Sequence, residues 1–327
     1  MGSWRDISDQ PRGSSNMIAF LERLDNASNI LVAGCGGGFD VFAGVPLAQH
    51  LMVEGKQVVF ASFSFTNLWL CGGERIAETV WRVDQRAAEI PYFPEKWLGE
   101  WMGRRDQLVP IYAFAKSGVR PLAAAYRTII ERHDIDTVIL VDGGTDSLVF
   151  GDESGVGSVV EDAVSLVAAD QAAGENVLLA AIGFGVDHYH GVSHHAFLEN
   201  AAQLIRDRGF LGMFSLSQGS KEADAFLDLV DYANQRQPQH PSIVCNSIAS
   251  ALRGEFGNYH VTNRTSGNEL FINPLMTQYW TFQSSAVVRR MAYAGQLAET
   301  ERAEDVRRII DLHREMSELR PFRPIPL

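Results

Sequence analysis

Cysteine is scarce in this chain of 327 residues, and its three cysteines form no recognisable pattern. Cys35, Cys71 and Cys245 are widely spaced, so they make neither a disulfide framework nor a zinc-binding motif. No apolar run approaches the roughly 20 residues that a helix needs to cross a bilayer, and the first ten residues contain no apolar signal core. We therefore expect a cytoplasmic protein in a reducing compartment, without a membrane partner.

Basic charge is also in short supply. The 28 lysines and arginines stand against 40 aspartates and glutamates, which gives a formal net charge of -12. Nucleic acids and anionic membranes are bound through clusters of Lys and Arg. The composition therefore argues against a nucleic-acid partner, while the hydrophobic share of 46% is ordinary for a soluble globular protein.

The motifs of two common enzyme classes are absent. The sequence has no Gly-x4-Gly-Lys-Ser/Thr segment, which excludes a P-loop NTPase, and no Gly-x-Ser-x-Gly elbow of a serine hydrolase. Cys35 has no identifiable base partner, so covalent cysteine catalysis is disfavoured as well.

What the sequence does contain is a regular alternation of apolar runs and amphipathic segments. Continuous apolar strands separated by helices are typical of a parallel sheet covered on both faces. Right-handed crossovers then predict an α/β fold with an open, doubly wound, mostly parallel sheet. The pattern places strands near 57–64, 108–113, 137–141, 176–182 and 210–214, and helices near 120–133, 159–173, 194–208 and 220–236.

We expect residues 1–16 to be a flexible lead-in and residues 17–327 to form a single α/β domain. Residues 67–106 form an aromatic-rich insertion that holds four of the six tryptophans. Three interpretations fit it: a lid over the site, a contact in a homo-oligomer, or a helical subdomain that buries its own aromatic side chains. Residues 257–327 combine a polar loop with amphipathic helices, the clearest of them over 301–319.

The most informative segment begins with an apolar run at Ile30 and continues into a glycine-rich turn and then Asp40. Such glycines let backbone N–H groups approach a ligand, and the helix that follows directs its positive end at it. We therefore predict that this glycine loop binds a small anionic metabolite; the alternative is that its glycines only permit a tight turn. The predicted ligand-binding residues of this loop are Gly34, Gly36, Gly37, Gly38 and Asp40.

The glycine loop lacks the features of a dinucleotide-binding site. Phe39 stands where the third glycine of the fingerprint is required, and no clear acid follows about 20 residues later to hold a ribose. We therefore expect neither a nicotinamide nor a flavin cofactor, and the same missing acid counts against a methyltransferase.

A carboxylate-rich turn follows the strand predicted at 137–141. Asp142 closes the strand, Gly143 and Gly144 turn the chain and can approach a ligand, and Asp146 follows. Carboxylates at the end of a strand can bind Mg²⁺ or Mn²⁺ or act as acid and base, so Asp142 and Asp146 are predicted catalytic residues and metal ligands. The alternative is an exposed acidic turn. Asp152 and Glu153 are further predicted metal ligands, and Ser158 with Glu161 fits a helix capping box.

A histidine-rich turn follows the strand predicted at 176–182. His188 and His190 are predicted to transfer a proton, while Asp187 and His194 are candidate ligands of a metal such as Zn²⁺. Ser193 is a predicted helix N-cap, which places His194 in the first turn, where the positive helix end favours a neutral ring. The alternative is a hydrated loop whose histidines only make hydrogen bonds.

In a doubly wound sheet, ligands bind beyond the carboxyl ends of the strands, so the three turns are expected to meet at one site. Arg264, in a polar loop rich in Asn and Thr, is the predicted partner of an anionic group at that site.

The glycine loop with Asp40, the carboxylate-rich turn with its continuation to Glu153, and the segment from Ser158 to Asp162 together resemble the family catalogued as Domain of Unknown Function 1152. The similarity extends over about residues 28–320. It implies a Rossmann-like α/β protein and transfers no activity. The residues that match its motifs are Gly36, Gly37, Gly38, Asp40, Gly143, Gly144, Asp146, Gly151 and Glu153.

These observations favour an enzyme that acts on a small anionic metabolite of nucleotide or sugar type. The expected reaction is metal-assisted or acid–base hydrolysis, elimination or group transfer, with Mg²⁺, Mn²⁺ or Zn²⁺ as the cation. Two alternatives remain open: a non-enzymatic module that binds or senses a nucleotide or another metabolite, and a structural oligomer joined through residues 67–106.

Overall fold

The computed structural model describes residues 18–324, so the predicted lead-in at 1–16 lies outside the described part of the chain. Nine strands form one sheet in the order β3-β4-β5-β2-β1-β6-β7-β9-β8. Their bounds are β1 (Asn29–Gly34), β2 (Gln57–Phe63), β3 (Glu74–Ala77), β4 (Val80–Val83), β5 (Ile111–Phe114), β6 (Thr137–Gly143), β7 (Val177–Ile182), β8 (Phe210–Ser215) and β9 (Gln278–Gln283).

The middle of the sheet is parallel. Strands β5, β2, β1, β6 and β7 run in one direction, while β4 and β9 pair antiparallel at the two flanks. The parallel strands are almost continuously apolar and buried, because helices cover both of their faces. The prediction of a doubly wound, mostly parallel, Rossmann-like sheet is confirmed.

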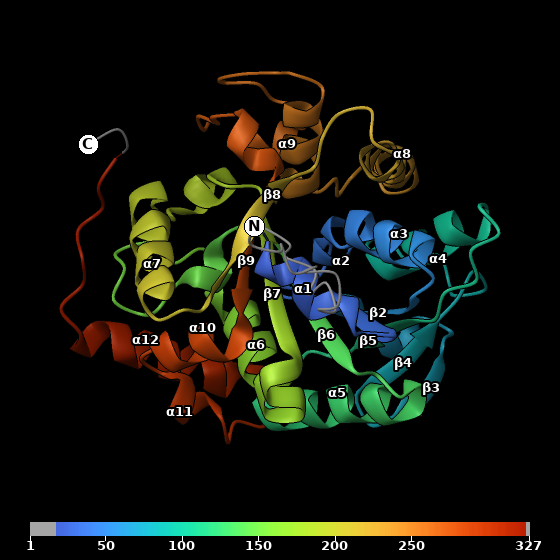
Figure 1. The fold of residues 1–327 in the computed structure, drawn as a ribbon, viewed down its shortest axis with the longest axis horizontal. Coiled ribbons are helices and arrows are strands. Elements are labelled where there is room, and N and C mark those ends of the chain that lie inside the picture. Colours follow the sequence, from blue (N-terminus) through green and yellow to red (C-terminus); the bar gives the residue numbers. More distant parts are fainter. Residues whose placement is uncertain (1–17, 325–327) are drawn as a thin grey trace, which may run out of the picture.

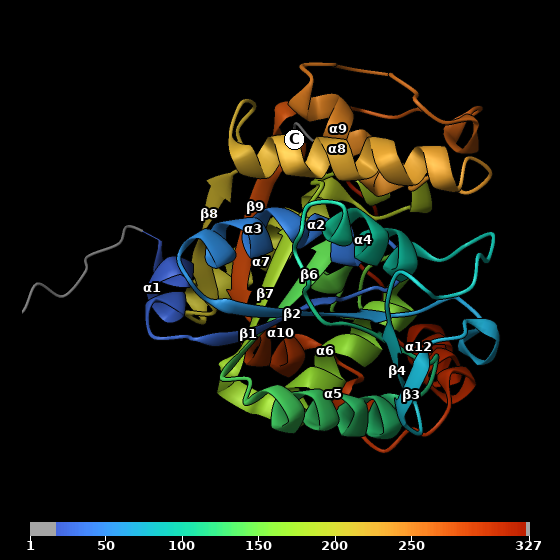
Figure 2. The same ribbon diagram turned by 90° about the vertical axis from the view of Figure 1, so that its right-hand side faces the viewer.

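Two layers of helices enclose the sheet, and each layer forms its own hydrophobic core. Figure 2 shows α3 and α4 on one side of the strands and α5 and α6 on the other. One layer contains α1 (Ala19–Asp25), α2 (Asp40–Ala43), α3 (Val45–Val53), α4 (Pro94–Gly103), α8 (Lys221–Arg236) and α9 (Ile243–Leu252). The opposite layer contains α5 (Val119–His133), α6 (Val159–Ala173), α7 (His194–Arg206), α10 (Ser284–Arg290), α11 (Ala294–Leu297) and α12 (Ala303–Met316) (Figure 1).

The insertion at 67–106 belongs largely to the sheet. Strands β3 and β4 form a hairpin that extends the sheet beyond β5, and α4 packs against α8. Trp81, Trp97 and Trp101 are buried, so most of the aromatic surface serves the core of the same chain. Trp69 is 68% exposed, and Tyr92 reaches the glycine loop, where its hydroxyl would collide with a Cβ at Gly38. The interpretation in which the segment buries its own aromatic side chains therefore fits best, although the segment combines a β-hairpin with one helix, α4, and packs into the main domain.

Candidate functional site

The carboxyl ends of β1 and β6 meet at the point where the chain reverses its winding direction. After β1 the chain passes through α2 and α3 to β2, and after β6 it passes through α6 to β7 on the opposite side. The divergence of the two connections leaves room above the strand ends, which is where ligands bind in this class of fold. Asp40 follows β1 through the glycine loop, and Asp142 is the penultimate residue of β6.

Five aspartates gather at this position, and we call them the carboxylate cluster. Four of them were predicted as site residues from the sequence; the fifth, Asp162, was not. Asp162 comes from the first turn of α6 and is 1% exposed. The cluster consists of Asp40, Asp142, Asp146, Asp162 and Asp187.

Glycines make the convergence of these side chains sterically feasible. A Cβ at Gly36 would lie 2.7 Å from an oxygen of Asp40 and 2.8 Å from one of Asp162. A Cβ at Gly143 would lie 2.9 Å from Asp40, and one at Gly144 would lie 2.8 Å from Asp187. Real Cβ atoms do not approach oxygens so closely, so any side chain at these positions would displace the carboxylates. The glycines of two loops therefore create the space that the cluster occupies.

The backbone amides of the glycine loop are partly used within the protein. The N–H of Gly36 donates to the carboxylate of Asp40 at 2.7 Å, and the N–H of Gly38 donates to the carbonyl of Phe63 at 3.0 Å. The helix that follows, α2, has only four residues. The loop thus binds its own carboxylate, which corrects the expectation that the amides of Gly36 and Gly38 face an anionic ligand. Gly34 allows a close approach to Val41, whose nitrogen lies 2.9 Å from the position of a Cβ.

Hydroxyl side chains fix three of the five carboxylates. Ser147 donates from its hydroxyl to Asp142, and Thr145 donates to Asp187 at 3.1 Å. Ser158 donates from both its N–H and its hydroxyl to Asp146 at 2.8 Å.

The capping box expected at Ser158 and Glu161 is wrong. The hydroxyl of Ser158 is turned towards Asp146 and accepts no hydrogen bond from α6. Glu161 instead pairs with Lys116 at 2.7 Å.

Asp162 differs from the other members because neither of its carboxylate oxygens has a hydrogen-bond partner, although both are buried. A buried carboxylate without partners is costly, so this side chain is suited to receive a ligand. Oxygen atoms of Asp40, Asp142 and Asp162 all lie within 4.8 Å of one another. Opposite ligands of one Mg²⁺ ion are roughly 4.2 Å apart, so a small inward movement would let all three bind the same cation.

Burial and mutual repulsion disfavour the charged form of every member. Burial raises the pKa of all five aspartates, and for Asp142 it does so to about 8, with the charge of Asp146 as the next cause. Asp142 and Asp146 also raise the pKa of Asp40, Asp162 and Asp187. His190 acts in the opposite direction and lowers the pKa of Asp146. Such a cluster must hold either protons or a cation.

Asp152 and Glu153 lie outside the carboxylate cluster, which corrects their assignment as metal ligands. Glu153 is 3% exposed, but its oxygens accept hydrogen bonds from the N–H of Gly151 and from Asn200 and Arg320. Asp152 pairs with Arg320 at 2.7 Å. Both carboxylates are therefore occupied by the C-terminal segment that carries Arg320.

The histidine-rich turn contributes Asp187 to the cluster, whereas its histidines flank the cluster without entering it. His188 and His190 are exposed and belong to a 3-10 helix, η4 (Val186–His190). The ring of His194 packs against those of His188 and Phe184, and is not among the side chains that could share a cation with the aspartates in residues 18–324. The assignment of His194 as a metal ligand therefore finds no place in the cluster, whereas the predicted N-cap at Ser193 is confirmed.

Arg264 influences Tyr92 through its charge. Its guanidinium donates to the carbonyl of Pro241 at 2.8 Å. Burial raises the pKa of Tyr92, the charges of Glu95 and Asp40 raise it further, and Arg264 lowers it. The positive charge of Arg264 and the negative charge of Asp40 thus act on the same hydroxyl group.

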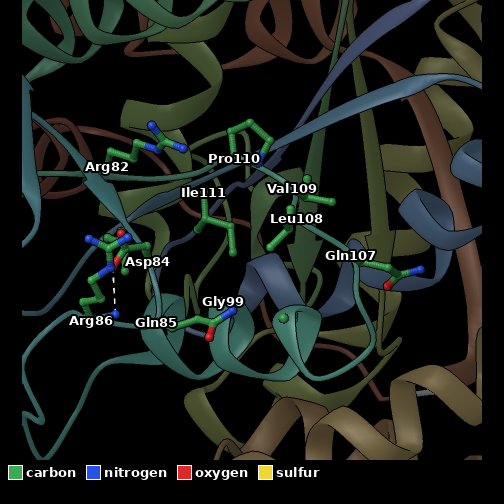
Figure 3. A pocket seen from close by; sticks show the side chains of 12 residues that line it. Arg82, Asp84, Gln85, Arg86, Gly99, Gln107, Leu108, Val109, Pro110 and Ile111 are labelled. Carbon is green, nitrogen blue, oxygen red and sulfur yellow. Dashed lines mark hydrogen bonds between the residues drawn. The ribbon is translucent and has the colours of Figure 1, made fainter.

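A separate hollow of about 320 Å³ lies between β4, α4 and the segment that leads into β5. Figure 3 shows Gln85 and Gly99 on one side of it and Pro110 and Ile111 on another. The guanidinium of Arg82 is directed away from α4 (Figure 3). Arg82 of β4 lies opposite Tyr112 of β5 in the sheet, and the hydroxyl of Tyr112 is hydrogen-bonded to His133 of α5. This hollow opens near the amino end of β5, at the opposite edge of the sheet from the carboxylate cluster.

Fold and site together define a Rossmann-like α/β protein with buried carboxylates at its topological switch point. The chain belongs to the family described as protein of unknown function (DUF1152), whose model matches residues 70–321. Four of the five clustered aspartates lie within that range, whereas the glycine loop and Asp40 precede it. No curated protein and no solved structure matches the chain.

Proposed function

We propose that the protein is an enzyme that uses a divalent cation, held by Asp40, Asp142 and Asp162, to act on a small anionic metabolite. The reaction is hydrolysis, elimination or group transfer at the carboxyl ends of β1 and β6. The observation that carries this proposal is Asp162, a buried carboxylate with no hydrogen-bond partner, within 4.8 Å of oxygens from two other aspartates.

The charge balance of the site supports a cation. The neighbouring charges that raise the pKa of Asp40, Asp162 and Asp187 come from other aspartates of the cluster. An anionic metabolite would be repelled by this cluster unless a cation lay between them. The donor atoms are carboxylate oxygens, which Mg²⁺ and Mn²⁺ prefer over the nitrogen and sulfur ligands typical of Zn²⁺. When bound, such a cation can polarise an oxygen of the metabolite and lower the pKa of a water.

Asp146 and His190 are the proposed proton-transfer pair. Asp146 is held by Ser158 and lies close enough to His190 for the imidazole charge to lower its pKa. A carboxylate and an imidazole that influence each other electrostatically are suited to act as acid and base in one reaction. His188, on the same 3-10 helix, stays a predicted second proton carrier, and Asp187 positions the turn through Thr145.

Asp162→Asn tests the cation directly. In protein stripped of metal, we expect Mg²⁺ or Mn²⁺ to raise the melting temperature of the wild type in a saturable way. Asp162→Asn should raise the melting temperature of the metal-free protein, because it removes one repelled charge, and should abolish the response to the cation. A higher melting temperature without metal, together with a lost response to the cation, distinguishes the loss of a metal ligand from a general loss of folding.

The matched control is Asp311→Asn, an exposed aspartate on α12, which should leave both melting temperatures unchanged. A cation response that persists in Asp162→Asn would refute the site. Phosphate release from a panel of phosphate esters then separates an enzyme from a binding module. Cation-dependent stabilisation by an ester without any turnover would favour the module.

A further inference from the structure

A row of three rings extends from the glycine loop, and we call it the aromatic rim: Phe65, Tyr92 and His240. The ring of Phe65 lies against the loop, 3.2 Å from the position of a Cβ at Gly38, and is 48% exposed. The centroids of Phe65 and Tyr92 are 6.4 Å apart, and those of Tyr92 and His240 are 6.1 Å apart. Phe65 is half-exposed, His240 is exposed and Tyr92 is partly buried, so the rim offers aromatic surface that can stack against a planar ring.

The aromatic rim is held in place by Gln237. Its side-chain oxygen accepts hydrogen bonds from the N–H of Phe93 at 3.2 Å and from the indole of Trp97 at 2.8 Å, and its nitrogen donates to the carbonyl of His240 at 2.9 Å. One buried amide thereby ties the segment that follows Tyr92 to the connection between α8 and α9. The rim is therefore preorganised, which lowers the entropic cost of binding a ligand there.

A hollow of about 440 Å³ opens directly beyond the rim, because the two neighbours of His240 line it. Figure 2 places α8 and α9 over α2, the helix that follows the glycine loop, so the hollow lies on the same side of the sheet as that loop. The lining combines apolar and carboxamide side chains with one arginine, and no acidic residue stands among those that the structure describes. Its lining includes Gln239, Pro241, Val261, Asn263 and Arg264.

The chemistry of this route changes along its length. At one end the carboxylate cluster accepts a cation and, through it, an anionic group. In the middle, Phe65 and Tyr92 offer ring faces. At the far end, Asn263 and Gln239 offer the paired donors and acceptors that match the edge of a heterocycle, and Arg264 offers positive charge. A volume of 440 Å³ is within the range of small-molecule sites.

We propose that the metabolite is a nucleotide, with its phosphate at the carboxylate cluster and its base at the aromatic rim and in the adjoining hollow. This inference rests on the proposed function for the placement of the phosphate. The placement of the base depends on the aromatic rim and the hollow, which are observed without reference to a cation.

The test compares four nucleoside 5′-monophosphates (AMP, GMP, CMP and UMP) with ribose 5-phosphate, by titration calorimetry in the presence of Mg²⁺. At least one nucleotide should bind roughly five- to a hundredfold more tightly than ribose 5-phosphate, the range expected for stacking of one base. Phe65→Leu, which removes the ring at a half-exposed position, should abolish this preference and leave the affinity for ribose 5-phosphate unchanged. Arg264→Gln should weaken nucleotide binding, whereas Arg253→Gln, which alters an exposed arginine paired with Asp231, should not.

The outcomes separate the two proposals. Equal affinity for ribose 5-phosphate and all four nucleotides would overturn the nucleotide assignment and leave the cation site intact. Nucleotide binding that needs Phe65 but is insensitive to Mg²⁺ and to Asp162→Asn would retain the base site and refute the placement of the phosphate. A preference for nucleotides that survives Phe65→Leu would refute the aromatic rim.

Discussion

Gly36 illustrates how one residue can shape the whole carboxylate cluster. Its φ angle is not in the left-handed region, so the backbone conformation does not require glycine here. Glycine is required because a side chain would collide with Asp40 and Asp162. Gly37 is different, because its φ is +92° and a Cβ there would lie 2.5 Å from the carbonyl oxygen of Phe63. A substitution at Gly37 would disturb the turn itself, whereas one at Gly36 reports on the site.

Gly36→Ala should impair cation binding more than folding. The added methyl group would lie less than 3 Å from oxygens of Asp40 and Asp162 and would force them apart. We expect the dissociation constant for Mn²⁺, measured by titration calorimetry, to increase by at least about tenfold, since metal sites tolerate ligand displacements of only about 0.2 Å. Gly295→Ala is the control, because a Cβ there meets nothing within 4 Å. Unchanged Mn²⁺ affinity in Gly36→Ala would contradict the assignment of these two ligands.

His194 provides a pH-dependent contribution to stability. Burial, and after it the charge of His188, lower its pKa to about 4. The native state therefore binds fewer protons at His194 than the unfolded chain does between pH 6.5 and pH 4. The stabilisation is fully present above pH 6.5 and is lost as the pH falls towards 4. We expect urea unfolding of metal-free protein to show this loss in the wild type relative to His194→Gln; identical pH profiles would contradict it.

Among the elements, the buried helices and strands were the most predictable from sequence. The helix expected at 159–173 has the same bounds in the structure, and the strand expected at 137–141 is longer by two residues, since it ends at Gly143. Long apolar runs identify such elements because burial on both sides leaves few polar positions. The hairpin of β3 and β4 was missed, since its two four-residue strands are short and partly exposed. Strand β9 was missed because the polar segment before it obscured its pattern, so most of 257–282 was read as loop.

The site residues that follow the carboxyl ends of strands could be predicted from the sequence. Asp142 lies at the end of β6 and Asp187 lies in the turn after β7, so the topology of the sheet brings them together. Asp162 lies inside a helix among Val159, Val160 and Glu161, and local spacing cannot show that its carboxylate faces residue 40. The prediction that Asp152 and Glu153 bind a metal is wrong because both carboxylates pair with Arg320, which is distant in the sequence, so local spacing cannot show the pairing.

The segment after α12 connects two of the site's loops. Arg320 binds Glu153 and Asn200, while the carbonyl of Arg323 accepts a hydrogen bond from Ser193 at 2.9 Å. The ring of Phe322 packs 5.5 Å from that of His188. The loop before α6 and the histidine-rich turn are thus both anchored by the C-terminal part of the chain.

Arg320→Ala should destabilise the protein by about 2–4 kcal/mol, because it leaves Glu153 buried without its cationic partner. Arg302→Ala, which removes an exposed pair with Glu304, should cost less than about 0.5 kcal/mol. Urea denaturation of both variants measures the difference. Equal stabilities would show that Asn200 and the backbone amides alone satisfy Glu153.

At the scale of the whole molecule, the two helical layers have different relations to the site. The layer with α8 and α9 lies over the glycine loop and provides Arg264 and His240, while the layer with α6 provides Asp162. Within residues 18–324, no helix has the length and apolar character needed to span a bilayer. Most of the tryptophans at 67–106 pack within the chain, whereas Trp69 and Leu70 are exposed.

The carboxylate cluster also has a consequence for the order in which the protein assembles. Its members come from four segments: the glycine loop, the turn with Asp142 and Asp146, α6 and the histidine-rich turn. In the unfolded chain the charges of different segments are far apart and repel one another little. The repulsion between segments arises only when β1, β6, β7 and α6 have come together. If a cation binds this cluster as proposed, it acts late, on a chain that is already almost folded, and we expect it to slow unfolding rather than to speed folding. Removal of such an ion would then shorten the lifetime of the folded molecule without changing the route by which it forms.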